Sequence, residues 1–303
     1  MTVPMALRSG SLTRLVQAAV KQSLSRSRCR KGALRFQSAS AVIPKPLDAD
    51  ALQFDIEGRA SDIATSLLTD GYYTTTSLLD SGTVQTLRSQ AIALHEQSPS
   101  RYEQSWSESI NEATGAVTRF DKPGVFACEP DGADYDTAPD TITYMSILIS
   151  TLPGALKPHI PESIACISDQ SFNAKLAFTG AQAEYPLHVD NSQGLAGGDL
   201  RKLTCILYLN PHPYQPADKG ELRLLLCNDR VVDLGPSDNR FVCFWTDEIP
   251  HKVLLTGGGD SDMDDPTVDR YALTVWLADS LESNIHNPKS KFADLRHTAF
   301  ASK

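Results

Sequence analysis

Long hydrophobic runs are missing from this sequence: no stretch approaches the roughly eighteen apolar residues of a membrane-spanning helix. Paired cysteines are missing as well, because the six cysteines form no Cys-x-x-Cys pair and follow no secretory signal. Most of them stand in apolar, strand-like stretches. We therefore expect no membrane span, no disulfide framework and no zinc–thiolate site, but buried thiols in a reducing compartment.

Acidic residues are absent from residues 1–46, which contain nine lysines or arginines and many serines. This composition is typical of an organelle transit peptide, and several apolar residues between Leu12 and Leu24 share one helical face. The segment predicts mitochondrial import. A disordered basic tail on a cytoplasmic protein and a plastid transit peptide are the alternatives left open.

The rest of the chain is strongly acidic, since the whole sequence has 37 Asp and Glu against only 28 Lys and Arg, nine of which lie in that first segment. Nucleic-acid binding depends mainly on neutralising phosphates with basic side chains. We therefore expect no nucleic-acid partner. The oligomeric state is not predicted by any pattern.

Residues 47–167 alternate between short helical and strand-like patterns, so we expect an α/β part that packs on a larger core. The polar residues 98–116 show little periodicity and predict a long surface loop. The regular elements expected here are a strand over Tyr72–Leu79, a helix over Ser81–Gln97, and a helix over Thr141–Leu152 that Pro153, Pro158 and Pro161 end.

Residues 168–279 change to short β segments separated by Gly, Pro, Asn or Asp, and 280–303 are expected to form a C-terminal tail. The spacing predicts a mainly β fold with flanking helices and a double-stranded β-helix, or jelly-roll, core. The expected strands are Phe172–Thr179, Tyr185–Asp190, Leu203–Asn210, Glu221–Cys227, Arg240–Thr246, His251–Leu255 and Arg270–Leu277.

The stretch Tyr185-Pro-Leu-His-Val-Asp-Asn191 places His188 and Asp190 two residues apart in an expected strand, so both side chains point to the same face. An isolated His-x-Asp is more often a pair of solvated surface residues. Here, a turn followed by Pro250-His251 supplies a second histidine. Two histidines and a carboxylate form the facial triad of non-haem Fe(II) oxygenases, which leaves open positions on the metal.

Arg270 begins an expected strand in which positions 270, 272, 274 and 276 share a face, so its guanidinium and the Thr274 hydroxyl can contact one ligand. A guanidinium binds a carboxylate in a planar, bidentate manner. Tyr208 lies on a neighbouring expected strand. The alternative for Arg270 is a strand-edge ion pair with Asp269, and Tyr208 and Thr274 are also ordinary strand residues.

Six blocks of sequence between Asn173 and Trp276 resemble the prolyl 4-hydroxylase branch of the Fe(II)- and 2-oxoglutarate-dependent dioxygenases, which includes the oxygen-sensing prolyl hydroxylases. The blocks follow the family's order. They are His188-Val-Asp-Asn191, Leu203-Thr-Cys-Ile-Leu-Tyr-Leu-Asn-Pro211, Gly220-Glu-Leu-Arg-Leu224, Phe241-Val-Cys-Phe-Trp245, Ile249-Pro-His-Lys-Val253 and Arg270-Tyr-Ala-Leu-Thr-Val-Trp276.

The resemblance implies a role for each matching residue. His188, Asp190 and His251 match the iron ligands, and Arg270 matches the arginine that holds the distal carboxylate of 2-oxoglutarate. Two further positions match residues that hydrogen-bond the same cosubstrate, namely Tyr208 and Thr274. No catalytic residue beyond the metal ligands is implied.

The implied cofactors are Fe(2+), 2-oxoglutarate as cosubstrate, O2 and the reductant L-ascorbate. The implied reaction hydroxylates a C–H bond of a prolyl residue in a peptide or protein, with release of succinate and CO2. Alternatives are a dioxygenase for a non-prolyl or small-molecule substrate, a non-catalytic jelly-roll binding module, and a zinc hydrolase that uses the same three ligands.

Three features depart from the oxygen-sensing members. An ungapped count places Phe178 where they have a tyrosine that lines the site. The loop after Asp190 is lengthened by Leu195-Ala-Gly-Gly198, and a Gly- and Asp-rich insertion separates His251 from Arg270 over residues 257–269. This insertion lacks the spacing of a calcium-binding loop, which favours a flexible, solvated loop. These differences affect the expected substrate more than the reaction.

Overall fold

The computed structural model describes residues 8–9, 42–110, 117–180, 183–210, 213–216, 218–256 and 270–298. Almost all of the basic segment 1–46, with its expected transit peptide, lies outside the described residues. The insertion 257–269 and the neighbouring Asp269 also lie outside them. No helix in the described part of the chain is both long and apolar enough to cross a bilayer.

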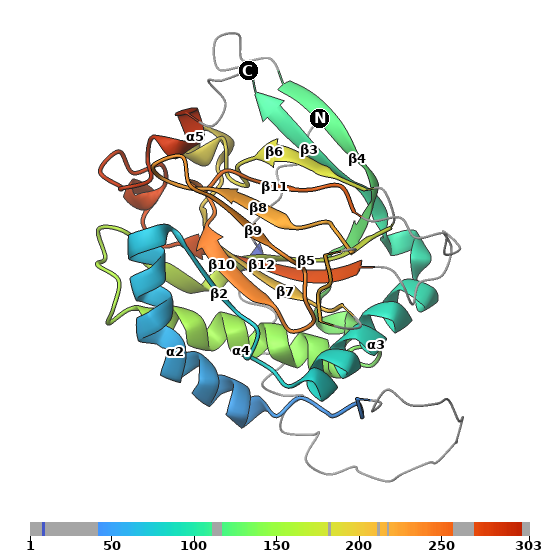
Figure 1. Cartoon of the computed structure of the whole chain (residues 1–303). Coiled ribbons are helices and arrows are strands. Elements are labelled where there is room, and N and C mark those ends of the chain that lie inside the picture. The colour runs from blue at the N-terminus through green and yellow to red at the C-terminus, as the bar shows by residue number, and fades with distance from the viewer. Residues whose placement is uncertain are drawn as a thin grey trace.

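A large antiparallel sheet forms one layer of the molecule and contains the strand that begins with Arg270 (Figure 1). The short strand β1 (Arg8–Ser9) also pairs with β5 (Ile167–Thr179). The order across the sheet is β2 (Tyr72–Thr75), β10 (Phe241–Trp245), β7 (Arg201–Tyr208), β12 (Arg270–Asp279), β5 (Ile167–Thr179), β4 (Val117–Cys128) and β3 (Glu103–Ile110).

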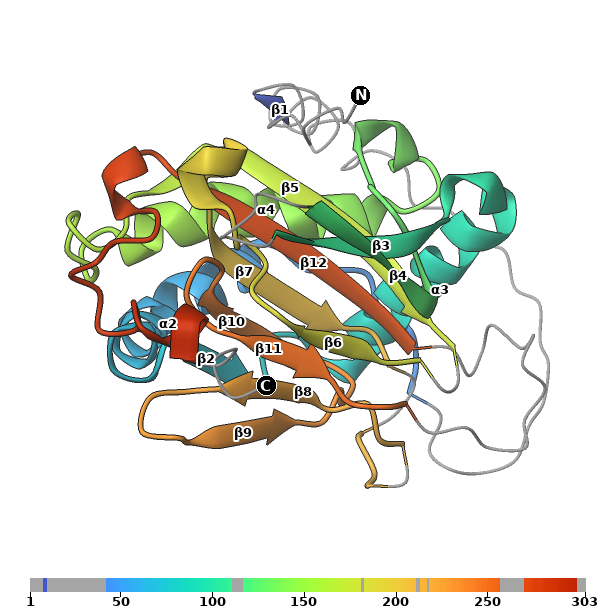
Figure 2. The same ribbon diagram turned by 90° about the horizontal axis from the view of Figure 1, so that it is seen from above.

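A second sheet of four strands lies beside the large one, and Figure 2 shows its strands in sequence across the lower part of the view. Its order is β6 (Tyr185–His188), β11 (His251–Val253), β8 (Leu222–Leu225) and β9 (Val231–Leu234). The two sheets confirm the predicted jelly-roll core with flanking helices.

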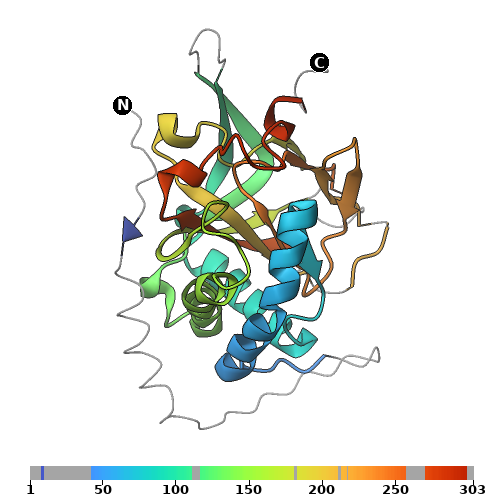
Figure 3. The same cartoon turned by 90° about the vertical axis from the view of Figure 1, so that its left-hand side faces the viewer.

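Three helices gather on the side of the large sheet away from the small one (Figures 1 and 3). They are α2 (Ala49–Asp70), α3 (Ser81–Gln97) and α4 (Pro139–Leu156). The last element that the structure describes is a four-residue helix, α5 (Leu295–Thr298). Asp48 and Asp80 cap α2 and α3 by accepting hydrogen bonds from backbone N–H groups in the first turn. The apolar faces of the helices and alternate residues of β12 pack in one core, so the opposite face of β12 is left for the site.

The predicted helix over Ser81–Gln97 matches α3, but the prediction that Pro153 ends the next helix was wrong. Pro153 lies inside α4, which continues to Leu156. Leu152 and Leu156 are both buried in the core, and this packing outweighs the hydrogen bond that proline removes. Tertiary contacts therefore set the end of this helix.

The predicted loop over 98–116 was also wrong, since Glu103–Ile110 form the edge strand β3. Glu103, Gln104 and Trp106 are exposed, so the strand lacks the apolar alternation that marks a half-buried strand. Helix α2 and strand β9 were not predicted. The hairpin of β3 and β4 extends the large sheet alongside β6 (Figure 2).

Candidate metal centre

The pairing of β6 with β11 brings the two predicted histidine ligands together. His188 and His251 face each other as partners in this antiparallel pair, and their ring centroids are 4.2 Å apart. Opposed residues in an antiparallel pair point to the same face. The two imidazoles are therefore neighbours in space, although 62 residues lie between them in the sequence.

Asp190 completes the cluster from just beyond the end of β6. Its Oδ1 atom lies 3.3 Å from Nε2 of His188 and 3.7 Å from Nε2 of His251. The three possible ligand atoms all lie within 4.8 Å of one another. The structure therefore brings together the three residues that the sequence predicts as metal ligands.

The hydrogen bonds of the two imidazoles leave both Nε2 atoms able to bind a cation. Nδ1 of His188 is 2.9 Å from the carbonyl oxygen of Pro186, and Nδ1 of His251 is 3.0 Å from that of Ile249. A carbonyl only accepts, so each Nδ1 carries the proton and each Nε2 presents a lone pair. Nε2 of His188 is buried without a hydrogen-bond partner. This donor set fits a divalent metal such as Fe(II).

The second carboxylate oxygen of Asp190 is held by the large sheet. Oδ2 accepts a 2.8 Å hydrogen bond from the indole Nε1 of Trp276 and a 3.1 Å bond from the Thr204 hydroxyl. The Arg201 guanidinium donates to the backbone oxygen of Asp190, at 2.8 Å. These bonds orient the carboxylate so that Oδ1 faces the histidines, which is the arrangement that supports metal ligands in proteins.

Burial and the neighbouring charges keep His188 and Asp190 in the forms that bind metals. Burial, reinforced by the neighbouring His251, lowers the pKa of His188 to about 4, so this imidazole is neutral at physiological pH. Burial alone would raise the pKa of Asp190, but His251, His188 and Arg201 outweigh it and hold that pKa well below its ordinary value. A neutral imidazole beside a carboxylate is ready for a cation without losing a proton.

The predicted cosubstrate residues lie on the same face of the large sheet. Arg270 stacks over the ring of Tyr208, with its guanidinium carbon 4.9 Å from the ring centroid, and donates a hydrogen bond to the Gly220 carbonyl. Tyr208 pairs with Ala272 of β12. Thr274 is the next residue of β12 on this face and pairs with Ile206 of β7. The face of β12 thus runs from Arg270 past Thr274 to Trp276, which contacts Asp190.

The placement of Phe178 in the site was wrong. Phe178 pairs with Tyr271, which is fully buried in the core on the opposite face from Arg270. Its ring contacts those of His95, Tyr102 and Phe126. The next residue, Thr179, is the one that pairs with Arg270. The ungapped count failed because a shift of one residue moves a side chain to the other face of a strand.

Two lysines that no sequence pattern singled out lie near the cluster. Lys175 of β5 pairs with Thr274, so it shares the face of β12 that carries Arg270. The Nζ atom of Lys122 in β4 lies 3.3 Å from the ring centroid of Tyr185, and that ring is 3.8 Å from the ring of His188. Only the strand registers reveal these positions.

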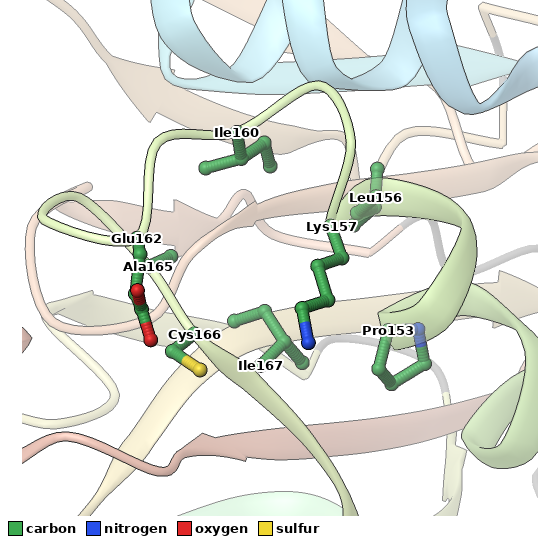
Figure 4. Close-up of a pocket in the computed structure, with 8 residues that line it drawn as sticks. All are labelled: Pro153, Leu156, Lys157, Ile160, Glu162, Ala165, Cys166 and Ile167. Atoms are coloured by element: carbon green, nitrogen blue, oxygen red, sulfur yellow. The ribbon is translucent and has the colours of Figure 1, made fainter.

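A pocket of about 210 Å³ lies away from the cluster, at the end of α4. Figure 4 shows that its lining combines apolar residues, such as Ile160 and Ile167, with Lys157 and Glu162. None of the predicted site residues line it. It is a surface feature separate from the metal centre.

Comparison with known families and structures agrees with this geometry. Residues 174–278 match the family model of the 2OG-Fe(II) oxygenase superfamily. This range contains His188, Asp190, His251 and Arg270. No curated protein sequence matches the chain significantly.

Several solved structures share the fold at low sequence identity. A prolyl-4-hydroxylase from Pseudomonas putida is 21% identical, with a TM-score of 0.54, over 73% of this chain and 98% of that one. A Trichoplax adhaerens prolyl hydroxylase, in complex with a peptide fragment of the hypoxia inducible factor oxygen degradation domain, is 22% identical, with a TM-score of 0.58, over 78% and 96%. A prolyl 4-hydroxylase from Phytophthora capsici is 21% identical, with a TM-score of 0.54, over 83% and 70%.

Residues 174–278 therefore match the family model of the 2OG-Fe(II) oxygenase superfamily, contain the cluster of His188, Asp190 and His251, and lie in a chain that shares its fold with prolyl hydroxylases.

Proposed function

We propose that this protein is an Fe(II)- and 2-oxoglutarate-dependent dioxygenase that hydroxylates a prolyl residue of a peptide or protein. The observation that carries the proposal is the cluster of His188, Asp190 and His251, together with Arg270 on the adjoining sheet face. Two histidines and one carboxylate leave metal positions open for a cosubstrate and O2. A hydrolase that uses only a metal-bound water would give Arg270 and Thr274 no common task.

The residues of this chain have separate tasks in the proposed reaction. His188 and His251 would each bind iron through Nε2, while Asp190 would bind through Oδ1. When bound, Fe(II) and 2-oxoglutarate would supply O2 activation, with succinate and CO2 as products and a hydroxyl group transferred to the substrate. L-Ascorbate belongs to the proposal as the reductant that keeps the metal ferrous.

Arg270 would hold the far carboxylate of 2-oxoglutarate. Its planar guanidinium suits a carboxylate, and Tyr208 fixes its position by lying beneath it. The Tyr208 side chain is 2% exposed, so it offers its hydroxyl in a place from which water is largely removed. Thr274 lies between this end of the site and the metal ligands and would hydrogen-bond the same cosubstrate.

The prolyl substrate is supported by the solved structures with this fold, which include prolyl hydroxylases from a bacterium, an animal and an oomycete. One of them is a complex with a peptide fragment. A peptide substrate also agrees with the hairpin of β3 and β4, which extends beside β6 and can border an extended chain. We propose such a peptide or protein as the partner of this chain.

The cofactor part of the proposal is tested by anaerobic titration of Fe(II) and then 2-oxoglutarate into the full chain, following the visible charge-transfer band of chelated iron. We expect a band that His188→Ala abolishes, and a 2-oxoglutarate affinity that Arg270→Ala lowers. A folded wild-type protein without any band would refute the dioxygenase and favour a binding module.

The substrate part needs a second experiment. Peptides that contain proline, lysine or asparagine are incubated in air with Fe(II), 2-oxoglutarate and L-ascorbate, and the gain of one oxygen is located by mass spectrometry. We expect the gain on proline. Oxygen added only to lysine or asparagine would defeat the prolyl assignment and leave the dioxygenase intact.

A further inference from the structure

Two basic side chains lie beside the predicted metal ligands, the buried Lys122 and the half-buried Lys175, and the proposed function gives neither of them a task. Lys122 is only 6% exposed. Its ammonium lies over the Tyr185 ring, which in turn contacts the ring of His188. One aromatic ring therefore links Lys122 to a predicted iron ligand.

Lys175 reaches the same region from the next strand. It pairs with Thr274 of β12, so its side chain is on the face that carries Arg270 and Trp276. Its Nζ atom donates a 2.5 Å hydrogen bond to the hydroxyl of Ser105 in β3. Strands β3, β4 and β5 thus bring two lysines and one serine to one side of the metal centre.

Neither lysine has the partner that a buried cation normally requires. Within the described part of the chain, Lys122 forms no hydrogen bond, and neither lysine forms an ion pair with a carboxylate. The nearby Arg201 is different, because it is held by the carboxylate of Asp199. Buried charges are ordinarily paired, since an unpaired one is costly to remove from water.

The two ammonium groups also disfavour each other. Burial and then the charge of Lys175 lower the pKa of Lys122 to about 6, against the opposing attraction of Asp190. Burial likewise lowers the pKa of Lys175. Stacking on Tyr185 offsets only part of this, because a desolvated cation–π contact contributes roughly 2 kcal/mol. A bound anion between the two amines would offset the cost of burying each positive charge and the repulsion between the two charges.

We infer that Lys122 and Lys175 form a carboxylate-binding subsite on the β4 and β5 side of the metal centre. This subsite is distinct from the place of Arg270. Lys175 pairs with Thr274, and Arg270 lies four residues away from Thr274 in the same strand, β12. The carboxylate has two sources in a reaction of the proposed kind, and the inference rests on that proposed function. It belongs either to the end of 2-oxoglutarate nearest the iron or to an acidic residue of the substrate next to the hydroxylated position.

The first arm of the test uses keto acids and the full chain loaded with Mn(II), which supports binding without turnover. Calorimetric titration compares 2-oxoglutarate with 2-oxopentanoate, which lacks the far carboxylate, for the wild type, Lys122→Met, Lys175→Met and Arg270→Ala. If the lysines bind the near carboxylate, both lysine variants bind both acids about tenfold or more weakly. Arg270→Ala weakens only 2-oxoglutarate.

The second arm uses two peptides that share a single proline and differ only in having aspartate or asparagine beside it. If the carboxylate belongs to the substrate, the keto-acid affinities stay unchanged in the lysine variants. The wild type then binds the aspartate peptide about tenfold or more tightly than the asparagine peptide, and Lys122→Met and Lys175→Met lose this preference. Placing the aspartate in turn on each side of the proline covers both directions of the peptide.

Folding and function are separated by two controls. Met at either position removes an amine that is costly to charge away from water, so these variants are expected to melt at or above the temperature of the wild type. Lys289→Met changes an exposed lysine and is expected to alter no affinity. Unchanged keto-acid affinities together with an unchanged peptide preference in both lysine variants would overturn the subsite.

The proposed function can fail separately. A wild-type protein that binds no 2-oxoglutarate would refute the dioxygenase. The comparison of the aspartate and asparagine peptides would then decide the subsite alone, since it needs no cosubstrate. A preference for aspartate that depends on the lysines would support it, and equal binding of the two peptides would overturn it.

Discussion

Trp276 donates its indole N–H to Oδ2 of Asp190 over 2.8 Å and so turns the other oxygen of that carboxylate toward two histidines. Trp276 belongs to β12 of the large sheet, Asp190 follows β6 of the small sheet, and 85 residues separate them in the sequence. The contact joins the small sheet, with its predicted metal ligands, to the strand that carries Arg270. Together with the bonds from Thr204 and Arg201 to Asp190, it fixes the two halves of the site to each other.

Trp276→Phe is expected to weaken metal binding while the fold is kept. Phenylalanine fills most of the same space but cannot donate to Asp190, and loss of such a supporting bond typically lowers metal affinity by about 10- to 100-fold. Competition of Fe(II) or Mn(II) with a chelator measures the change. Trp106→Phe, on an exposed part of β3, is the matched control. Equal loss in both variants would contradict the role of the indole.

Gly220→Ala is expected to weaken 2-oxoglutarate binding. Gly220 has a φ of +72°, and a Cβ atom there would lie 2.7 Å from the Nη1 atom of Arg270 and 2.9 Å from the Thr256 methyl group. The left-handed backbone costs alanine about 1–2 kcal/mol, and Arg270 must move. Calorimetric titration measures the affinity. Gly58→Ala lies in helix α2 with open space around it and should leave binding unchanged.

Lys202→Met is expected to lower the free energy of unfolding by about 3–5 kcal/mol. The Lys202 ammonium is buried and donates to Asp247 at 3.0 Å, to Glu248 at 3.2 Å and to the Asn284 carbonyl at 3.0 Å. Methionine would leave two carboxylates without their cation. Urea denaturation measures the loss, and a change below about 1 kcal/mol would show that the acids protonate or rearrange freely.

Lys122→Met is expected to raise the melting temperature more at neutral pH than near pH 10. The pKa of Lys122 is lowered from 10.5 to about 6, first by burial and then by Lys175. As the pH falls through this range, the unfolded chain takes up a proton that the folded protein does not. The wild type therefore loses stability relative to the variant, and the full difference is reached below about pH 6.

Melting curves at several pH values check the sign of this effect. A gain that stays constant between neutral pH and about pH 10 would show that the amine titrates normally in the folded protein. A loss of stability at neutral pH would show that the ammonium has a structural partner. Either result would remove the argument that Lys122 is a buried amine without a partner for its charge. The subsite would then be decided by the binding measurements alone.

The sequence by itself determined the strands that carry the site. His188 and Asp190 are neighbours in the chain, and the alternation of a strand places Arg270 and Thr274 on one face, so local geometry suffices for each pair. The same holds for helix α3, whose apolar residues recur at helical spacing. These features depend on residues close together in sequence, so the amino-acid pattern was enough to predict the jelly-roll core, and the family resemblance added His251 as the third candidate metal ligand.

Only the tertiary structure decided which strands meet and in what register. The pairing of β6 with β11 brings His251 opposite His188, and that of β5 with β12 places Lys175, rather than Phe178, on the face that carries Arg270. A shift of one residue reverses the face of every side chain in a strand. Register is fixed by burial across the whole sheet, which no local pattern contains, and for this reason the two lysines and the bond from Trp276 to Asp190 were visible only in the folded chain.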